Sequence, residues 1–317
     1  MTTTACPLCQ AEARYAFSSR DLMFDLYQRH DYCACTHCAL VFMTPMPDAE
    51  TIASFYPSTY DIYDDDDRPL KTDAWKQSVL HHRLGYHHLP AKLPAALTRW
   101  ATLPATTPHW ISGGLLLDVG CGNGRFLRNM QALGWQVQGV ELSEDGVRVC
   151  RKADLPVHHG DIFSAALPSD HFDVITARHV IEHVPDPHAF VSELVRVLKP
   201  GGRIIIETPN SQALGRAWLG VNWFANEVPR HLYLYHPDNL QRLASDHGLQ
   251  CDTLQLSTSP KILLNSIDYI VANRKRPSKR IRWRRLLARL YVWLAQRSGR
   301  GDIVHASFIK PAHGEQR

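Results

Sequence analysis

Residues 115–124 read Leu-Leu-Leu-Asp-Val-Gly-Cys-Gly-Asn-Gly, and this stretch decides the fold. A short apolar run of this length and composition is typical of a buried parallel strand. Gly120, Gly122 and Gly124 let the main chain turn sharply and approach a ligand with no Cβ in the way. Residues 125–134 then have helical spacing and stop at a glycine. The sequence therefore predicts a strand, turn and helix that bind an adenosine-type ligand at the carboxyl edge of an α/β sheet.

The spacing of the glycines separates two kinds of ligand. Dinucleotide-binding folds need G-x-G-x-x-G, because a pyrophosphate sits on the helix N-terminus. Here the third glycine comes one residue early, and Asp118 stands just before the turn. An acid at that place would repel a pyrophosphate but could hold an ammonium group. The D-x-G-x-G-x-G pattern resembles that of class I S-adenosylmethionine-dependent methyltransferases, whose ligand carries an amino group and a sulfonium but no phosphate.

The resemblance continues along the chain and implies a cofactor site. Residues 135–142 predict a second strand, and its Glu141 could accept both ribose hydroxyls. In the family, an acid at the place of Asp161 faces the adenine amino group, and its neighbour packs on the ring. The cofactor-binding residues implied by the resemblance are Asp118, Gly120, Cys121, Gly122, Gly124, Glu141, Leu142, Asp161, Ile162 and Arg178.

The same resemblance implies the fold. Residues 172–177 match the fourth strand of the family, and residues 198–209 match its turn and fifth strand. A last strand is expected at residues 302–311. We therefore expect an α/β, Rossmann-like domain with a mostly parallel seven-stranded sheet and helices on both faces. The resemblance covers about residues 113–260.

Composition agrees with an ordinary globular protein. The chain has 317 residues, a length that is enough for one large domain and a smaller one. Hydrophobic residues make up 44% of it, and its formal charge is +4. The N-terminus has no basic-then-apolar signal segment, and no apolar run approaches the roughly 20 residues of a membrane-spanning helix. Eight cysteines in a chain this long do not suggest a secreted disulfide framework. We expect a cytoplasmic protein.

Four cysteines near the N-terminus form two C-x-x-C knuckles. Cys6 pairs with Cys9, and Cys35 pairs with Cys38 after 25 intervening residues. Two thiolates in each of two tight turns complete the tetrahedron that zinc prefers. A redox pair is the alternative, but one knuckle would suffice for that, and no thioredoxin-like βαβ pattern surrounds either. The sequence predicts a structural zinc that folds a subdomain too small to stabilise itself.

The segments after the second knuckle set the domain boundaries. Residues 41–47 and 55–61 look like the N-terminal part of zinc-ribbon methyltransferases, which are often associated with bacterial sugar or exopolysaccharide pathways. We expect a zinc ribbon over 1–60 and a helical connector or lid over 61–112. The methyltransferase domain would then span 113–317, with a basic helical insertion at about 261–300.

Two segments offer a catalytic base. A hydroxyl acceptor would benefit from a base, and histidine has an ordinary pKa near neutrality. Our hypothesis is that His231 is the base and that Arg230 anchors an acidic substrate or a sugar phosphate. His183, just beyond the fourth strand, is the second candidate, although in this superfamily a histidine at that place often only orders the loop.

A metal-assisted reaction stays open. His179, Glu182 and His183 fall at i, i+3 and i+4, which would place them on one face of a helix and could bind a divalent ion. Ubiquinone-pathway O-methyltransferases resemble this region but have an acid where this chain has His179.

The charge changes sharply near the C-terminus. Residues 274–300 carry eleven Lys and Arg and no acid, among apolar residues at largely helical spacing. Three interpretations stay open: a helix packed on the core, an interfacial helix on anionic lipid, or a nucleic-acid contact.

These observations predict a methyltransferase that uses S-adenosylmethionine and carries a structural zinc. Its acceptor would be a small molecule or glycan-pathway intermediate, methylated on oxygen or carbon. One alternative is a quinone-pathway-like O-methyltransferase, peripheral at the inner membrane surface. Another is an RNA methyltransferase, although the ribbon has few basic residues. A cofactor-binding scaffold without activity is the third, and the acids at 118, 141 and 161 speak against it.

Overall fold

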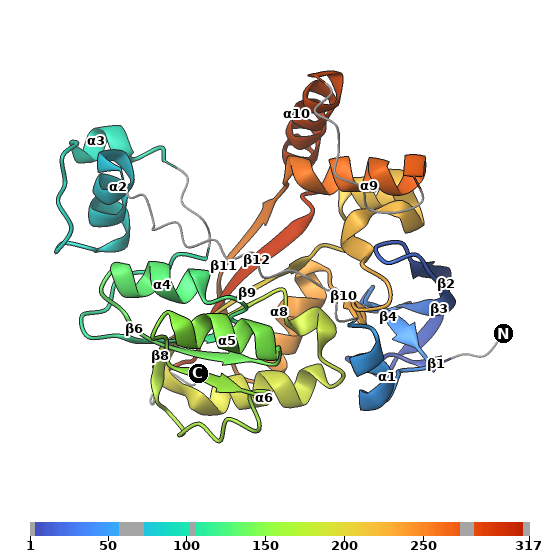
Figure 1. The fold of residues 1–317 in the computed structure, drawn as a ribbon, viewed down its shortest axis with the longest axis horizontal. Coiled ribbons are helices and arrows are strands. Elements are labelled where there is room, and N and C mark those ends of the chain that lie inside the picture. The colour runs from blue at the N-terminus through green and yellow to red at the C-terminus, as the bar shows by residue number, and fades with distance from the viewer. Residues whose placement is uncertain (1–3, 57–72, 102–105, 273–281, 313–317) are drawn as a thin grey trace. The chain divides into compact units, whose positions relative to one another are not determined.

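The computed structural model of the chain describes residues 4–56, 73–101, 106–272 and 282–312. These residues form two sheets (Figure 1). A five-stranded sheet has the order β1-β2-β3-β4-β10, and a seven-stranded sheet has the order β11-β12-β9-β8-β5-β6-β7. The second order, with its parallel central strands, confirms the expected Rossmann-like α/β fold.

The element bounds follow the sequence pattern closely. The strands are β1 (Thr4–Ala5), β2 (Glu12–Asp21), β3 (Leu26–Cys35), β4 (Val41–Thr44), β5 (Leu115–Val119), β6 (Gln136–Glu141), β7 (Val157–His159), β8 (Phe172–Arg178), β9 (Leu198–Pro209), β10 (Tyr233–Leu234), β11 (Gln250–Ser257) and β12 (Ile303–Ile309). The helices are α1 (Ala49–Ser54), α2 (Ala74–Leu84), α3 (Ala95–Thr98), α4 (Arg125–Ala132), α5 (Glu144–Lys152), α6 (Pro187–Val197), α7 (Leu214–Leu219), α8 (Pro237–Asp246), α9 (Pro260–Ala272) and α10 (Arg282–Arg297). Short 3₁₀ turns are η1 (Ile181–His183), η2 (Gly220–Asn222) and η3 (Phe224–Asn226).

The chain divides into two compact units, each built from three segments. The first unit comprises residues 1–60, 179–191 and 206–306, and the second comprises residues 61–178, 192–205 and 307–317. Both units therefore combine residues from distant parts of the sequence.

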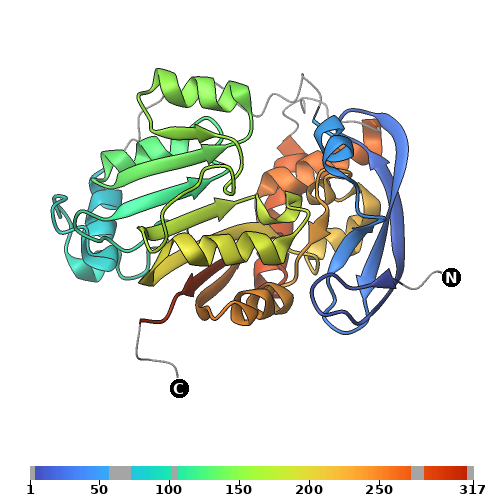
Figure 2. The same ribbon diagram turned by 90° about the horizontal axis from the view of Figure 1, so that it is seen from below.

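Parallel strands form the centre of the second unit. β5 pairs with β6 on one side and with β8 on the other, which places Asp118 beside Gly139 and Thr176. Leu116 and Leu117 are fully buried, as the uninterrupted apolar run of β5 predicts. The helices α4 and α5 follow β5 and β6 and pack alongside the strands (Figure 2). The carboxyl ends of β5, β6 and β8 therefore share one edge of the sheet.

The described part of the predicted connector contains two helices, α2 and α3, and contributes to this core. Asp73 caps the N-terminus of α2, where its carboxylate accepts a hydrogen bond from the Lys76 main-chain N–H at 2.8 Å. Tyr86 is fully buried, and its hydroxyl accepts a hydrogen bond from Trp135 Nε1 at 3.0 Å. Leu80, also fully buried, joins the same apolar cluster. This segment is therefore packed on the α4 and β6 side of its unit.

The five-stranded sheet of the first unit uses residues from two parts of the chain. β2 and β3 form a long antiparallel hairpin, and β4 pairs with β3. The fifth strand, β10, pairs with β4 so that Tyr233 lies opposite Phe42. The ribbon sheet thus includes residues 233–234, which the predicted range 1–60 leaves out.

The basic insertion consists of α9 and α10, between β11 and β12. β12 falls within the last strand expected at residues 302–311. Among the helices of the described residues, none is both long enough and apolar enough to span a bilayer.

Candidate functional site

The glycine turn of the second unit has the conformation that its sequence predicts. Gly120, Gly122 and Gly124 have φ values of 69°, 58° and 70°, in the region that favours glycine. At Gly124 a Cβ would come within 2.5 Å of Leu155 Cδ1 and 2.8 Å of Cys150 Sγ. Conformation and packing therefore both require glycine at position 124, where α4 begins.

Asp118 has a different set of partners from the one expected. Its side chain is fully buried and accepts hydrogen bonds from Thr176 Oγ1 at 2.6 Å and from Arg178 Nη2 at 3.1 Å. Burial raises the pKa of Asp118, and the Arg178 guanidinium opposes that rise. The acid therefore orients Arg178 instead of offering an open place for an ammonium group, which corrects the expectation. Thr176 is a site residue that the sequence analysis missed.

Arg178 lies between an acid and an aromatic ring. Its guanidinium carbon stands 4.1 Å from the centroid of the Phe126 ring, a cation–π arrangement. Its Nε atom is buried and has no hydrogen-bond partner in the described part of the chain. A buried donor of this kind is costly unless a ligand completes it.

Glu141 connects the glycine turn to the next loop. One carboxylate oxygen accepts from the Gly122 main-chain N–H at 2.7 Å, and the other accepts from the Ser143 N–H at 2.8 Å. The residue is 6% exposed. The carboxylate therefore fixes the glycine turn to the loop that follows β6.

The two other adenosine residues differ in accessibility. Asp161 is exposed, and its Oδ1 accepts from the Ser164 N–H at 2.7 Å. Ile162 is 2% exposed, so its side chain packs in the core and cannot lie on an adenine ring as expected. Leu142 and Phe163 are 72% and 48% exposed. Exposed apolar side chains close to Glu141 and Asp161 suit the faces of an adenine ring. The sequence analysis missed Phe163, which its place two residues after Asp161 could have indicated.

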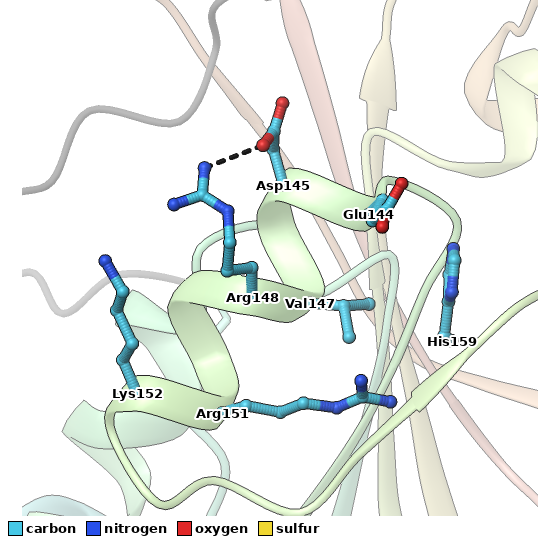
Figure 3. Close-up of a pocket in the computed structure, with 7 residues that line it drawn as sticks. All are labelled: Glu144, Asp145, Val147, Arg148, Arg151, Lys152 and His159. Atoms are coloured by element: carbon cyan, nitrogen blue, oxygen red, sulfur yellow. Dashed lines mark hydrogen bonds and ion pairs between the residues drawn. The ribbon is translucent and has the colours of Figure 1, made fainter.

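A hollow of about 740 Å³ lies on α5 (Figure 3). Its walls come from α5 and from His159 at the end of β7. Arg148 donates to Asp145 within it at 2.7 Å, so part of its charge is neutralised internally. None of the residues implied by the resemblance lines this hollow. The lining residues are Glu144, Asp145, Val147, Arg148, Arg151, Lys152 and His159.

A buried carboxylate organises the polar cluster of the first unit. Glu182 lies in η1, is fully buried, and accepts hydrogen bonds from His179 Nδ1 at 3.2 Å and from Thr208 Oγ1 at 2.9 Å. Burial opposes ionisation of Glu182, but the neighbouring histidines outweigh it and lower the pKa. Glu182 is therefore a buried anion with dedicated partners.

His179 bridges two acids. Its Nε2 donates to Glu207 Oε1 at 3.1 Å while its Nδ1 donates to Glu182, so both ring nitrogens carry hydrogen. Desolvation lowers the pKa of His179, yet the two acids raise it overall, which makes the ring an imidazolium at neutral pH. On the other side of Glu207, His305 Nδ1 lies 3.4 Å from Oε2. The sequence analysis missed Glu207 and His305. Both lie on strands, and strand spacing alone does not reveal that Glu207 contacts His179 and His305.

His183 and His231 come together beside Glu182. His183 Nδ1 donates to the Arg230 carbonyl at 2.9 Å and lies 3.0 Å from the Tyr56 hydroxyl. His231 Nδ1 donates to the Ala225 carbonyl at 3.0 Å. Because a carbonyl can only accept, each ring carries a hydrogen on Nδ1, so Nε2 is the nitrogen that bears the lone pair in the neutral form of either ring.

The two histidines differ in their surroundings. His183 is partly exposed, whereas His231 is 4% exposed. Burial, together with the nearby His183, lowers the pKa of His231 to about 3. The geometry therefore favours His183 as a base over His231, which the sequence analysis placed first.

Arg230 cannot anchor a substrate as expected. Its side chain is fully buried, and its guanidinium donates to Asp21 at 2.6 and 3.2 Å and to Glu227 at 3.1 Å. Asp21 ends β2, so this ion pair fixes the β2–β3 hairpin to the segment before β10. Tyr32 reinforces the link, since its hydroxyl donates to the His231 carbonyl at 2.8 Å. Arg230 therefore has a structural role.

The expected metal triad is rearranged. The helix that would align His179 with His183 is reduced to the short turn η1, and His179 lies before it with a φ of 54°. Instead, ligand atoms of Glu182, His183 and His231 lie within 4.8 Å of one another. The set with the geometry of a metal site thus contains His231 in place of His179.

The four knuckle cysteines converge. Their Sγ atoms all lie within 4.8 Å of one another, with Cys6 to Cys38 at 3.6 Å and Cys9 to Cys35 at 3.4 Å. The main-chain N–H groups of His37 and Cys38 donate to Cys35 Sγ at 3.4 and 3.3 Å. Desolvation raises the pKa of the Cys35 thiol, but the hydrogen bonds from these N–H groups outweigh it and lower the pKa to about 7.

Comparisons with known proteins agree with this architecture. A family model described as a methyltransferase domain matches residues 86–254. The ubiquinone biosynthesis O-methyltransferase of Thiobacillus denitrificans is 33% identical over 158 residues, which cover 45% of this chain and 68% of that protein. The protein of the same name from Chromobacterium violaceum is 30% identical over 186 residues, covering 52% and 80%. An S-adenosylmethionine-dependent methyltransferase structure from Archaeoglobus fulgidus aligns with a TM-score of 0.46 and 22% identity, over 62% of this chain and 86% of the other.

The match spans more than half of the chain and falls on the glycine turn and the strands that surround it. The chain belongs to the class I S-adenosylmethionine-dependent methyltransferase family, and it is an enzyme of that class.

Proposed function

We propose that this enzyme transfers the methyl group of S-adenosylmethionine to a hydroxyl oxygen of a small acceptor. The relatives named for ubiquinone biosynthesis support an oxygen acceptor, so the quinone-type alternative is stronger than the glycan-pathway acceptor that we placed first. The observation that carries the proposal is the hydrogen bond from His183 Nδ1 to the Arg230 carbonyl, which makes Nε2 the ring nitrogen that can accept a proton.

The residues present fit the cofactor. Arg178, with its unpartnered Nε, would pair with the carboxylate of the methionine moiety. Glu141 would accept the ribose hydroxyls, and Leu142 and Phe163 would cover the adenine ring. Asp161, which is exposed, would face the adenine amino group. Arg178 ends this set in the sequence, and the next residue, His179, begins the histidine cluster.

When bound, S-adenosylmethionine supplies an electrophilic methyl carbon, which bonds to the acceptor oxygen as the carbon–sulfur bond breaks to leave a thioether. His183 Nε2 takes the proton that the hydroxyl loses. The Arg230 carbonyl keeps His183 in the tautomer that can accept this proton. His231 packs edge to face against His183 and limits the rotation of its ring.

The four cysteines would hold a structural zinc. Four cysteine sulfurs that all lie within 4.8 Å of one another suit tetrahedral coordination as thiolates. The N–H groups that point at Cys35 are the expected outer partners. With all four positions filled by protein, the ion would stabilise the β2–β3 hairpin and take no part in methyl transfer.

A metal-assisted version of the same transfer is the second candidate. Glu182, His183 and His231 offer one carboxylate and two imidazole lone pairs, a donor set that binds divalent ions. Both rings are oriented by backbone carbonyls, as metal-binding histidines commonly are. An ion at this place would lower the pKa of an acceptor hydroxyl and leave His183 unavailable as a base.

The test is a methyl-transfer assay with purified protein and three acceptor classes. We expect turnover with quinols and none with sugar nucleotides or RNA. Full turnover after chelation, with zinc content unchanged at one per chain, is expected from the base mechanism. Turnover that returns only with added Mg²⁺ or Mn²⁺ would support the metal-assisted version, and methylation of a sugar nucleotide alone would reject the quinone-type acceptor.

A further inference from the structure

The helices α9 and α10 of the first unit pack against each other (Figure 1). They present an apolar face that nothing in the described part of the chain covers. We propose that this face binds the surface of an anionic membrane, with α10 lying in the plane of the lipid headgroups.

α10 has two apolar faces. Ala288, Tyr291 and Ala295 are at most 2% exposed and belong to an apolar cluster that includes Leu214 and Leu263. This buried face accounts for the packing of α10 within its unit. A helix that only needed to pack here would carry polar residues on its other side.

The other face of α10 is apolar and exposed. Leu286, Leu290 and Trp293 fall at i, i+4 and i+7, so they form one stripe, and they are 71%, 51% and 56% exposed. Single exposed apolar residues are ordinary on a protein surface, but a stripe along one helix marks an interaction surface. Leu287, beside the stripe, is 43% exposed.

The charge around the stripe identifies the partner. Residues 274–300 carry eleven Lys and Arg and no acid. The only acid between 260 and 300 is Asp268, which is buried and paired with Arg284. Arg289 and Arg297 are exposed on the same helix. An apolar stripe with basic residues and no exposed acid suits lipid tails beside anionic headgroups.

The same charge disfavours two other occupants. A second copy of this chain would bring a second set of cations against the first, and like charges repel. RNA would be bound through aromatic stacking between basic residues, whereas two of the three stripe residues are leucines. An anionic lipid surface satisfies both the charge and the leucines.

The proposal is tested by co-sedimentation of the full-length protein with vesicles. One set of vesicles contains phosphatidylcholine with 30–40% phosphatidylglycerol, and the other contains phosphatidylcholine alone. We expect binding to the anionic vesicles that weakens as salt is raised. Arg289→Gln with Arg297→Gln should lower the partition coefficient roughly 25-fold, at about fivefold for each arginine.

Apolar variants separate insertion from simple charge attraction. Leu286→Ser with Leu290→Ser should reduce binding by roughly tenfold or more, because the exposed stripe loses its apolar contact with the bilayer. Leu97→Ser with Trp100→Ser removes two other residues, 57% and 79% exposed, and serves as the matched control with binding unchanged. Unaltered binding of S-adenosylhomocysteine confirms that each variant is folded.

Four outcomes would overturn the proposal. The first is failure to bind anionic vesicles at low salt. The second is equal binding by the Leu286→Ser, Leu290→Ser variant. The third is a dimer in solution that this variant converts to a monomer, which would assign the face to a second copy; salt-sensitive binding to RNA without vesicle binding would equally reject a lipid partner. None of these results depends on the acceptor of the methyl group.

Discussion

The rings of His183 and His231 meet edge to face with their centroids 4.7 Å apart and their planes at 75°. Each ring is anchored through Nδ1 to a main-chain carbonyl, so neither can exchange its tautomer without breaking a hydrogen bond. The pair lies 48 residues apart in sequence, and the segment containing Arg230 brings the two together. The two rings therefore differ in role: the partly exposed ring of His183 can take a proton, and the buried ring of His231 packs against it.

Replacement of His183 by Gln should reduce kcat by about 10²- to 10⁴-fold, the usual contribution of a positioned base. The affinity for S-adenosylhomocysteine, measured by calorimetry, should stay within twofold, because no predicted cofactor contact changes. His236→Gln removes a histidine that caps α8 and provides the control with normal turnover. Retention of full activity by the His183→Gln enzyme would contradict the assignment of the base.

Replacement of Glu141 by Gln should weaken S-adenosylhomocysteine binding about 10- to 100-fold, since charge-assisted hydrogen bonds contribute about 1.5–3 kcal/mol. The Gly122 and Ser143 N–H groups would also lose an ionised acceptor. Calorimetric titration measures the change, and Glu144→Gln, at an exposed acid three residues away, should leave the affinity as it is.

Two glycine variants separate backbone conformation from packing. Gly124 and Gly201 have φ values of 70° and 78°, but only at Gly124 would a Cβ meet neighbours, whereas nothing lies within 4 Å at Gly201. Gly201→Ala should cost about 1–2 kcal/mol of stability, the cost of an L-residue in the left-handed region. Gly124→Ala should cost more and also weaken cofactor binding. Thermal unfolding and calorimetry report the two effects, and equal costs at the two positions would show that packing around Gly124 is unimportant.

The buried ion pair between Asp21 and Arg230 should be costly to break from one side. Asp21→Asn should lower the free energy of unfolding by about 3–5 kcal/mol, because it leaves a buried guanidinium poorly compensated. The exposed pair of Glu12 with Arg14 supplies the comparison, and Arg14→Ala should change stability by about 0–1 kcal/mol. Denaturant titration distinguishes the two; a similarly small effect of Asp21→Asn would mean that water reaches Arg230.

Removal of one knuckle ligand should release the zinc and destabilise the ribbon. Cys6→Ser leaves three thiolates, so we expect less than one zinc per chain and a lower Tm. A strong chelator should produce the same shift in the wild-type protein. Cys251→Ser alters a partly exposed cysteine outside the cluster and should change neither zinc content nor Tm. Normal stability of zinc-free protein would contradict the structural role.

The family, the sheet and the glycine turn could be predicted from the sequence because they depend on neighbouring residues. An apolar strand, three glycines and a strand-end acid report local conformation and burial. In the structure β5 lies before the glycine turn and α4 follows it, as this pattern predicts. The cysteine knuckles could be predicted for the same reason, because each C-x-x-C turn forms between neighbouring residues. Only the convergence of the two turns depends on the tertiary structure.

The partners of charged and titratable side chains could not be predicted in this way. Arg230 was expected to bind a substrate. Only the fold shows that its guanidinium already pairs with the carboxylate of Asp21, 209 residues earlier. Asp118 was expected to hold a ligand, yet Thr176 and Arg178 reach it from the neighbouring strand. In the same way, His179 is held by Glu182 and Glu207 and is lost to the expected metal triad.

The sequence by itself therefore determined which local elements form and to which family the chain belongs, because strand burial and turn conformation follow from residues close in the chain. Only the tertiary structure decided which ionisable groups are satisfied internally and which keep a free lone pair. The physical reason is that desolvation and pairing depend on neighbours in space, and a charge that is already paired in the protein interior is no longer available to a ligand.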